Sequence, residues 1–198
     1  GYIDRASAKL QSGYMSTAYW SKKTTIRFNM MLGKEKTYQA WNGIPAHLLK
    51  INRTYNSAGT EKPGEPYTNE TDNYWQNHYQ LFWNQEISAS WHFNTALFYT
   101  YGKGYYEQYK ANKTLSNYGI APIVVGVDTI KKTDIVRQLW LNSDFYGQIF
   151  SFQQKKEKQQ FTIGGGWSKY LGNHHGEVVW TKLKPSAQNI YYNNNSYK

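Results

Sequence analysis

The clearest pattern in the chain is an alternation of apolar and polar residues in two stretches between residues 74 and 106. One set of alternate positions is aromatic or aliphatic: Trp75, Tyr79, Leu81 and Trp83 in the first stretch, and Phe93, Leu97, Tyr99 and Tyr101 in the second. The other set is mostly polar: His78, Gln80, Asn84, Asn94 and Thr100. Because successive side chains of a strand point to opposite faces, the pattern predicts a β-hairpin with one apolar and one polar face. Its turn is expected at about residues 87–90.

Both arms of this hairpin are long. Strands of soluble domains usually have about 5–6 residues, whereas a tilted strand needs about 9–11 residues to cross a bilayer. Trp75 and Trp83 lie eight positions apart, which is about 26 Å along a strand. After a tilt near 40° this becomes about 20 Å, close to the roughly 25 Å apolar band of an outer-membrane barrel. The arms are therefore predicted to be membrane-crossing strands, with an apolar face toward lipid and a polar face toward a wet lumen.

The rest of the chain repeats this organisation. Further strands are expected at residues 4–19, 24–33, 137–154 and 159–172, with short turns at 20–23 and 155–158. Residues 34–73, 107–136 and those after 172 are expected to form three long loops, because Gly, Pro, Asn and Asp interrupt the pattern there. Short turns alternate strictly with long loops, as in outer-membrane barrels. The predicted fold is all-β: an antiparallel up-and-down meander of about six long strands, forming a partial transmembrane β-barrel with long extracellular loops.

Composition narrows the function classes. The 198 residues include 19 Tyr and 8 Trp but no cysteine, so disulfides and thiolate metal sites are excluded. No continuous run of about 20 apolar residues exists, so no membrane-spanning helix is expected. The formal net charge of +10 is dispersed over several short lysine pairs rather than gathered in one stripe. A nucleic-acid partner is therefore not expected.

Several longer segments carry a family resemblance: LGKEKTYQAWNGIP at 32–45, residues 52–74, GKGYYEQYK at 102–110, WLNSDFYG at 140–147 and GGGWSKYLGNHHGEVVW at 164–180. In this order they resemble the barrel region of TonB-dependent outer-membrane receptors. The resemblance implies a place in the cell outer membrane and active uptake of a large scarce nutrient, typically a ferric siderophore or cobalamin and sometimes a glycan. Uptake in this family is driven by the inner-membrane TonB complex.

The same resemblance sets expectations for partners. Members of the family close a barrel of 22 strands around an N-terminal plug, and an energy-coupling segment precedes the plug. Neither is seen in residues 1–198, so we expect this chain to be one fragment of a receptor barrel. Its implied partners are the remainder of the barrel and its plug, the TonB complex through the missing N-terminal part, outer-membrane lipid and a small-molecule nutrient.

Aromatic residues in the expected loops are candidate ligand contacts, because exposed aromatics in binding loops often stack on ligands. The candidates are Tyr38, Trp41, Tyr55, Tyr67 and Trp180. The alternative is that they pack loop against loop. The first long loop is also basic, with Lys34, Lys36, Lys50 and Lys62, which would suit an anionic ligand.

Catalytic and metal-binding motifs are weak. His174 and His175, followed by Glu177, form the only cluster with the appearance of a metal site, yet adjacent histidines of a strand point to opposite faces. Residues 164–166 are three glycines without the Lys-Ser/Thr of a phosphate-binding loop, and predict a bulge, a bend or a close backbone approach. No metal, no cofactor and no enzymatic activity are expected.

A different class of protein could share this alternation. A soluble, aromatic-rich β-sandwich that binds carbohydrate would bury Tyr79, Leu81, Leu97 and Tyr99 against a second sheet. Strands of more than ten residues argue against that alternative.

Overall fold

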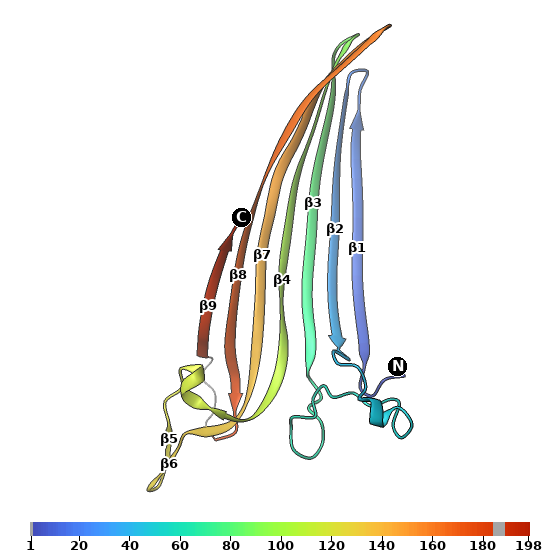
Figure 1. The fold of residues 1–198 in the computed structure, drawn as a ribbon. Helices are drawn as coiled ribbons and strands as arrows, with labels where there is room; N and C mark the ends of the chain where they lie inside the picture. Colours follow the sequence, from blue (N-terminus) through green and yellow to red (C-terminus); the bar gives the residue numbers. More distant parts are fainter. Residues whose placement is uncertain (1, 184–188) are drawn as a thin grey trace.

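The computed structural model describes residues 2–183 and 189–198, and most of them lie in one large antiparallel sheet (Figure 1). The sheet contains β1 (Ser7–Trp20), β2 (Thr24–Tyr38), β3 (Thr71–Ser88), β4 (Trp91–Thr114), β7 (Lys132–Lys156), β8 (Gln159–Thr181) and β9 (Asn189–Tyr197), paired in that order. The short strands β5 (Ile123–Val125) and β6 (Asp128–Ile130) form a separate hairpin, and Ala46–Leu48 and Leu115–Tyr118 are single 3-10 turns. Among the described residues, no helix has the length and apolar character needed to cross a membrane.

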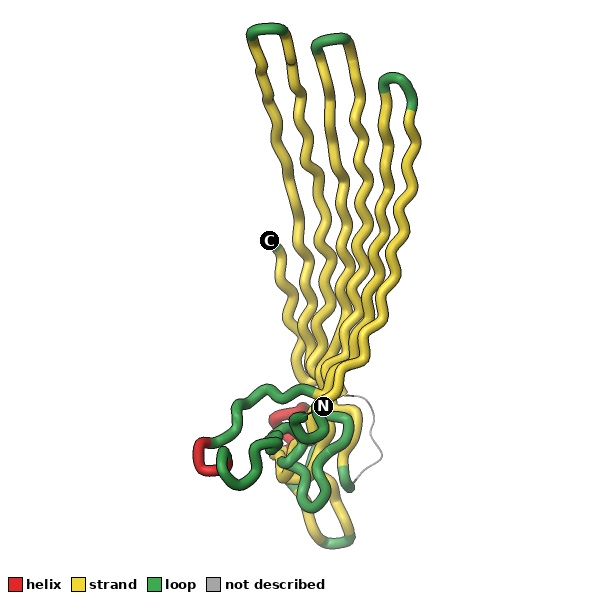
Figure 2. The backbone as a smooth tube through the Cα atoms, turned by 90° about the vertical axis from the view of Figure 1, so that its right-hand side faces the viewer, coloured by secondary structure: helices red, strands yellow, loops and turns green. Residues whose placement is uncertain are grey.

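The two ends of the sheet differ in their connections. Short turns at residues 21–23, 89–90 and 157–158 join β1–β2, β3–β4 and β7–β8 at one end, which we call the turn end. The long segments 39–70 and 115–131 lie together at the other end, the loop end (Figure 2). The all-β antiparallel meander and its three short turns are therefore confirmed, although the described strands do not close into a barrel.

The third long loop expected after residue 172 was wrong over its described part, and residues 184–188 of that segment lie outside the described residues. β8 continues to Thr181, and β9 pairs with it from Leu171↔Tyr197 to Val178↔Asn189, so the sheet has seven strands. The reason is that strand pairing uses backbone groups and does not require alternation of side chains. β4 and β7 also extend beyond their expected ends, to Thr114 and from Lys132. Tyr38 and Trp180, expected in loops, lie in β2 and β8.

The register confirms that the two alternating sets lie on opposite faces of the sheet. Leu81 lies opposite Phe28 and Leu97, and Tyr79 lies opposite Met30 and Tyr99. We call this the aromatic face. His78, Gln80 and their neighbours lie on the other face, where nearly all strand glycines also lie: Gly33, Gly102, Gly104, Gly147, Gly164, Gly166, Gly172 and Gly176. We call this the glycine face.

The missing side chains of these glycines leave room for aromatic rings of neighbouring strands or, at Gly172, of the same strand. A Cβ atom on Gly104 would meet the ring of Tyr74, one on Gly147 would meet Phe98, and one on Gly172 would meet Tyr170. Gly164 and Gly166 approach the backbone of Phe150 and Gln148 closely, which is one of the roles expected for the three glycines. Rings that cover strand glycines stabilise curved sheets.

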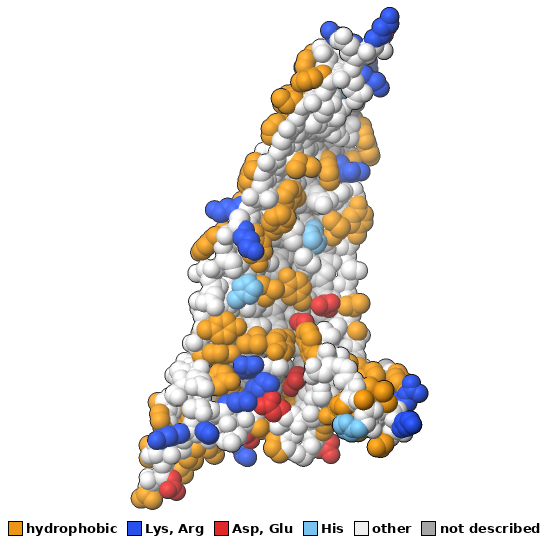
Figure 3. All heavy atoms as spheres, in the orientation of Figure 1, with side chains coloured by type: hydrophobic (Ala, Val, Ile, Leu, Met, Phe, Trp, Pro, Cys, Tyr) orange, Lys and Arg blue, Asp and Glu red, His pale blue; other side chains and the backbone are white. Residues whose placement is uncertain are grey.

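The buried core is small and lies at the loop end. Its centre is Tyr118, Ile135 and Val178, with Ile120 and Tyr191 packed against them. Along the rest of the sheet, the aromatic face is open: Trp83, Leu97 and Ile163 are 42%, 44% and 58% exposed. Figure 3 shows separate hydrophobic side chains at several heights of the sheet, among His, basic and uncharged polar side chains. The described residues provide no second sheet over Tyr79, Leu81, Leu97 and Tyr99, which the β-sandwich alternative requires.

Candidate ligand-binding site

The long segment 39–70 is folded against the loop end of the sheet by a buried asparagine. Asn56 is 1% exposed. Its side-chain amide donates to the carbonyls of Asp4 (3.0 Å) and Gln39 (3.1 Å), and its carbonyl oxygen accepts from the backbone N–H of Ala58 (3.0 Å). The guanidinium of Arg5 donates to the carbonyl of Ala58 (2.9 Å) as well. All the hydrogen-bonding groups of the Asn56 side chain are thereby used, and the loop is tied to the beginning of β1.

Two tyrosines hold the same loop against β4. The hydroxyl of Tyr38 lies 2.7 Å from the carbonyl oxygen of Tyr67. The hydroxyl of Tyr67 donates to Glu107 Oε1 (2.5 Å), and its ring lies 5.8 Å from the ring of Tyr109. Burial and the Glu107 carboxylate raise the pKa of Tyr67, so this phenol remains a hydrogen-bond donor at neutral pH.

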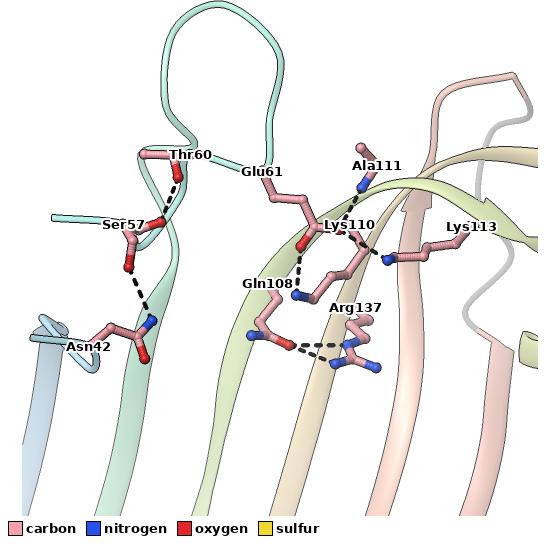
Figure 4. A network of polar contacts seen from close by, with 9 residues as sticks. All are labelled: Asn42, Ser57, Thr60, Glu61, Gln108, Lys110, Ala111, Lys113 and Arg137. Atoms are coloured by element: carbon pink, nitrogen blue, oxygen red, sulfur yellow. Dashed lines mark hydrogen bonds and ion pairs between the residues drawn. The ribbon is translucent and has the colours of Figure 1, made fainter. Parts of the chain in front are cut away.

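Glu61 makes a third attachment between the loop and β4. Its carboxylate lies 2.7 Å from Lys110 Nζ and 3.2 Å from Lys113 Nζ, and accepts from the backbone N–H of Ala111 (3.2 Å) (Figure 4). Burial alone would raise the pKa of this carboxyl group, but the two lysines outweigh it and hold the pKa below its ordinary value. The Glu61 carboxylate therefore forms ion pairs with both Lys110 and Lys113.

These attachments enclose a cavity of about 580 Å³ between the loop and β4, within the range of about 300–1,000 Å³ found for small-molecule sites. The residues that line it are Trp41, Asn42, Ser57, Ala58, Thr60, Glu61, Glu70, Tyr106, Gln108 and Lys110. On β4, Tyr106, Gln108 and Lys110 alternate with Glu107 and Tyr109, so they belong to the glycine face. The cavity therefore opens above the glycine face at the loop end.

Two aromatic rings form one wall of the cavity. The ring of Trp41 is 56% exposed, and its centroid lies 5.7 Å from that of Tyr106, with a tilt of 54° between the ring planes. Burial raises the pKa of Tyr106 even though Arg137 lies near its hydroxyl. An exposed indole beside a neutral phenol offers a flat apolar surface to a ligand.

Glu70 contributes a polar group without a partner. The residue is 9% exposed, and its Oε2 atom is buried without a hydrogen bond. Burial raises the pKa of the carboxyl group, while backbone N–H groups of Gly59 and Tyr109 and the charge of Lys110 act in the opposite direction. A buried, unsatisfied carboxylate oxygen costs free energy. A ligand that donates a hydrogen bond here would remove that cost.

Gln108 and Asn42 supply complementary polar groups. Arg137 donates from Nε (3.2 Å) and Nη2 (2.8 Å) to Gln108 Oε1, and Figure 4 shows the amide nitrogen of Gln108 on the side away from Arg137. Gln108 is therefore oriented as a donor. Asn42 donates to Ser57 Oγ (3.0 Å), which leaves its carbonyl oxygen as an acceptor.

The five predicted ligand contacts separate in the structure. Trp41 lines the cavity, while Tyr38 is 5% exposed and, with Tyr67, attaches the loop to the sheet. Tyr55 is half-buried, and its N–H donates to the carbonyl of Asn52. Trp180 lies 6.1 Å from the ring of Tyr109 and lines, with Tyr67, a second cavity of about 350 Å³.

Sequence reasoning missed every residue of the cavity wall except Trp41, including Glu61, Glu70, Tyr106, Gln108 and Lys110. The available signal was the alternation of Tyr106, Gln108 and Lys110 with Glu107 and Tyr109, which continues the pattern of β4 into the segment expected to be loop. No sequence signal pairs Glu61 with Lys110, because their contact depends on the path of the loop.

The two adjacent histidines lie apart, as expected. His175 stacks on Trp140 on the aromatic face (5.7 Å, 4° between planes), whereas His174 lies opposite Leu141 on the glycine face. Within residues 2–183 and 189–198, no group of three or more His, Asp or Glu side chains is arranged to hold a metal ion.

Comparison of the chain with models of known protein families gives no match, and comparison with curated proteins gives none either. The function must therefore be inferred from the sequence pattern and from the geometry of the sheet and its loops.

Proposed function

We propose that this chain is part of the barrel of an outer-membrane receptor for TonB-dependent active uptake of a large scarce nutrient. Its partners are then the remainder of the barrel and its plug, the inner-membrane TonB complex, outer-membrane lipid and the nutrient. The chain has no catalytic role in this proposal. The family resemblance of the loop and strand segments is one support, and the surface chemistry of the sheet is the other.

The observation that carries the proposal is the exposed aromatic face. Soluble monomers rarely expose apolar patches larger than a few hundred Å², yet exposed apolar side chains occur on this face in all six strands from β1 to β8 of the main sheet. They include Met15, Tyr19, Ile26, Leu32, Leu81, Trp83, Leu97, Tyr99, Phe150, Phe152, Phe161, Ile163 and Trp167. Lipid is a solvent in which such a face is stable.

The loop-side border of this face has the composition of a membrane interface. Lys34 Nζ lies 5.2 Å from the ring centre of Trp75, and Lys103 Nζ lies 5.3 Å from that of Trp140. Tryptophan is enriched where apolar and polar phases meet, and lysine can extend its charge from there to the headgroups. These pairs support a membrane boundary near the centre of the long strands, with the loop end outside it.

The glycine face supports a lumen on the other side. It carries Gln80, His78 and Asn94, and its small residues allow a sheet to curve toward it. The cavity at the loop end opens above this same face, where a nutrient would enter.

The free edges of β1 and β9 support the need for further strands. Each of these strands pairs on one side only within the described sheet. In lipid every unpaired backbone group costs several kcal/mol, so an open sheet requires neighbours that complete the barrel.

The proposal is tested by locating the full-length protein and measuring uptake. It should fractionate with the outer membrane, run as a heat-modifiable band on gels, and support nutrient accumulation that stops when the TonB complex is deleted. A protein found in the soluble fraction without detergent, or uptake that continues without the TonB complex, would contradict the proposal.

A further inference from the structure

On the basis of the receptor function proposed above, we infer that the cavity between the loop and β4 binds a neutral sugar residue of a glycan, and not an anionic ferric chelate. The cavity is the one built by Trp41, Glu70, Tyr106 and Gln108 beside the Glu61–Lys110 ion pair. Three features of its wall lead to this choice.

The first feature is charge. An anionic ligand needs cations that are free to meet it. Among the residues that the structure describes, Lys110 is the only cation that lines the cavity, and the carboxylate of Glu61 lies 2.7 Å from its Nζ atom. A second carboxyl group, Glu70, lines the same cavity. The wall, as far as the structure describes it, therefore offers no cation without a carboxylate partner, although Arg137 lies beside it and donates to Gln108 Oε1.

The basic residues of the loop do not alter this balance. Lys36 donates to Asn69 Oδ1 (2.9 Å), Lys62 donates to the carbonyl of Glu65 (2.9 Å), and Lys34 lies over Trp75 on the aromatic face. These three, and Lys50 as well, are absent from the cavity wall. The basic residues of this loop therefore do not make the cavity an anion-binding site.

The second feature is the mixture of donors and acceptors. Gln108 presents an amide donor, Asn42 presents a carbonyl acceptor, and Glu70 presents a carboxylate oxygen without a partner. Each hydroxyl of a sugar is both a donor and an acceptor, so a ring with several hydroxyls can satisfy all three at once. Glu70 is nine-tenths buried, and a hydroxyl that donates to its Oε2 would make a hydrogen bond to a charged group.

The third feature is the aromatic wall. A sugar ring has one face made largely of C–H bonds, and these carry a small positive charge that is attracted to the negative face of an aromatic ring. Trp41 is the most exposed aromatic residue of the cavity and lies 5.7 Å from Tyr106. The indole can therefore stack on one face of the sugar while the polar groups bind its rim.

The experiment is calorimetric titration of the purified full-length receptor in detergent. The probes are a series of neutral oligosaccharides, comprising α- and β-linked glucans, mannans and xylans, and in parallel one ferric tris-catecholate and one ferric hydroxamate. We expect at least one neutral oligosaccharide to bind and the ferric chelates not to bind. We also expect the affinity for the sugar to be the same at low and high salt, because no charge attraction contributes.

Variants assign the binding to this cavity. Trp41→Ala and Glu70→Gln should each weaken oligosaccharide binding about tenfold or more, while Trp41→Phe should retain most of the affinity. Trp20→Ala is the matched control, because Trp20 is exposed at the turn end, and it should leave binding unchanged. Circular dichroism and heat modifiability verify that each variant is folded.

Three results would overturn the inference: binding of the ferric chelates alone, no binding of any neutral oligosaccharide, or sugar affinity unchanged in both Trp41→Ala and Glu70→Gln. The receptor proposal fails by a different measurement, since it depends on outer-membrane location and TonB-dependent uptake. A protein of the outer membrane that takes up only ferric chelates would keep the proposed function and remove the glycan.

Discussion

The ring of Tyr74 on β3 lies where a side chain of Gly104, its partner on β4, would have to be. A Cβ atom on Gly104 would overlap the ring and the α-carbon of Tyr74 and the carbonyl oxygen of Asn73. Because two of these three atoms belong to the backbone, the neighbours cannot move away easily. Because residue 104 has no side chain, the Tyr74 ring can cover the backbone pairing of β3 with β4 on the glycine face.

Gly104→Ala should therefore destabilise the sheet by about 1–3 kcal/mol, the usual cost of inserting a group into a packed site. The matched control is Gly13→Ala on β1, where a Cβ atom would meet nothing within 4 Å. Urea unfolding in detergent micelles, followed by tryptophan fluorescence, measures the difference. Equal midpoints for the two variants would show that the Tyr74 ring does not need the glycine.

Charge placed on the two faces should have unequal effects. Leu97 lies on the aromatic face and is 44% exposed, and Asn94, on the same strand, lies on the glycine face. A cation on a lipid face near the middle of a membrane costs about 2–4 kcal/mol, and much less on a lumen face. Leu97→Arg should reduce the amount of heat-modifiable protein in the outer membrane, and Asn94→Arg should not. Equal losses would contradict the assignment of the faces.

The Asn56 side chain should control the order of the loop. Asn56→Ala removes its hydrogen bonds to Asp4, Gln39 and Ala58, at a cost of about 1–3 kcal/mol for each buried group left unsatisfied. Trypsin should then cut residues 39–70 faster than in the parent. Asn52→Ala is the control, because Asn52 Oδ1 accepts from the nearby Thr54 hydroxyl in an exposed position, and its cleavage rate should equal that of the parent.

The Glu61 attachment should depend on pH. Its lowered pKa means that the ion pairs stabilise the folded loop fully above the ordinary carboxyl pKa of 4.5, and that this contribution is lost as the pH falls through the lowered value. Glu61→Gln should therefore increase hydrogen exchange of residues 57–62 and 108–113 at neutral pH. At a pH well below the lowered pKa of Glu61, the variant and the parent should exchange alike, after correction for intrinsic rates. A difference that persists unchanged at the acidic pH would exclude the ion pairs as its cause.

The sequence predicts the half of the sheet near the turn end well, because apolar and polar residues alternate there with few exceptions. Trp83, Leu81 and Tyr79 point to one face and Gln80 and His78 to the other, and the register of β3 and β4 follows. Nearer the loop end, apolar alternation no longer marks the strands. β9 is largely Asn and Tyr, and only its backbone pairing with β8 identifies it.

The cavity was less accessible to sequence reasoning than the sheet. Trp41 could be proposed as a ligand contact because it is an aromatic residue in an expected loop. The same reasoning selected Tyr38, which is buried and ties the loop down, so residue type alone does not separate packing from binding. Glu70 becomes a candidate only when its burial and its lack of a partner are known.

The orientation of the sheet relative to lipid can be measured with single cysteine labels, because residues 1–198 contain no cysteine and any cysteine elsewhere in the full-length protein can be replaced by serine. Single variants Leu97→Cys and Asn94→Cys of the full-length receptor, each labelled with the same fluorophore in vesicles, report the surroundings of the two faces. Brominated acyl chains should quench the label at position 97 strongly and aqueous iodide should quench it weakly, with the reverse order at position 94. Quenching of both labels by iodide alone would contradict the account, because both faces of β4 would then be in water.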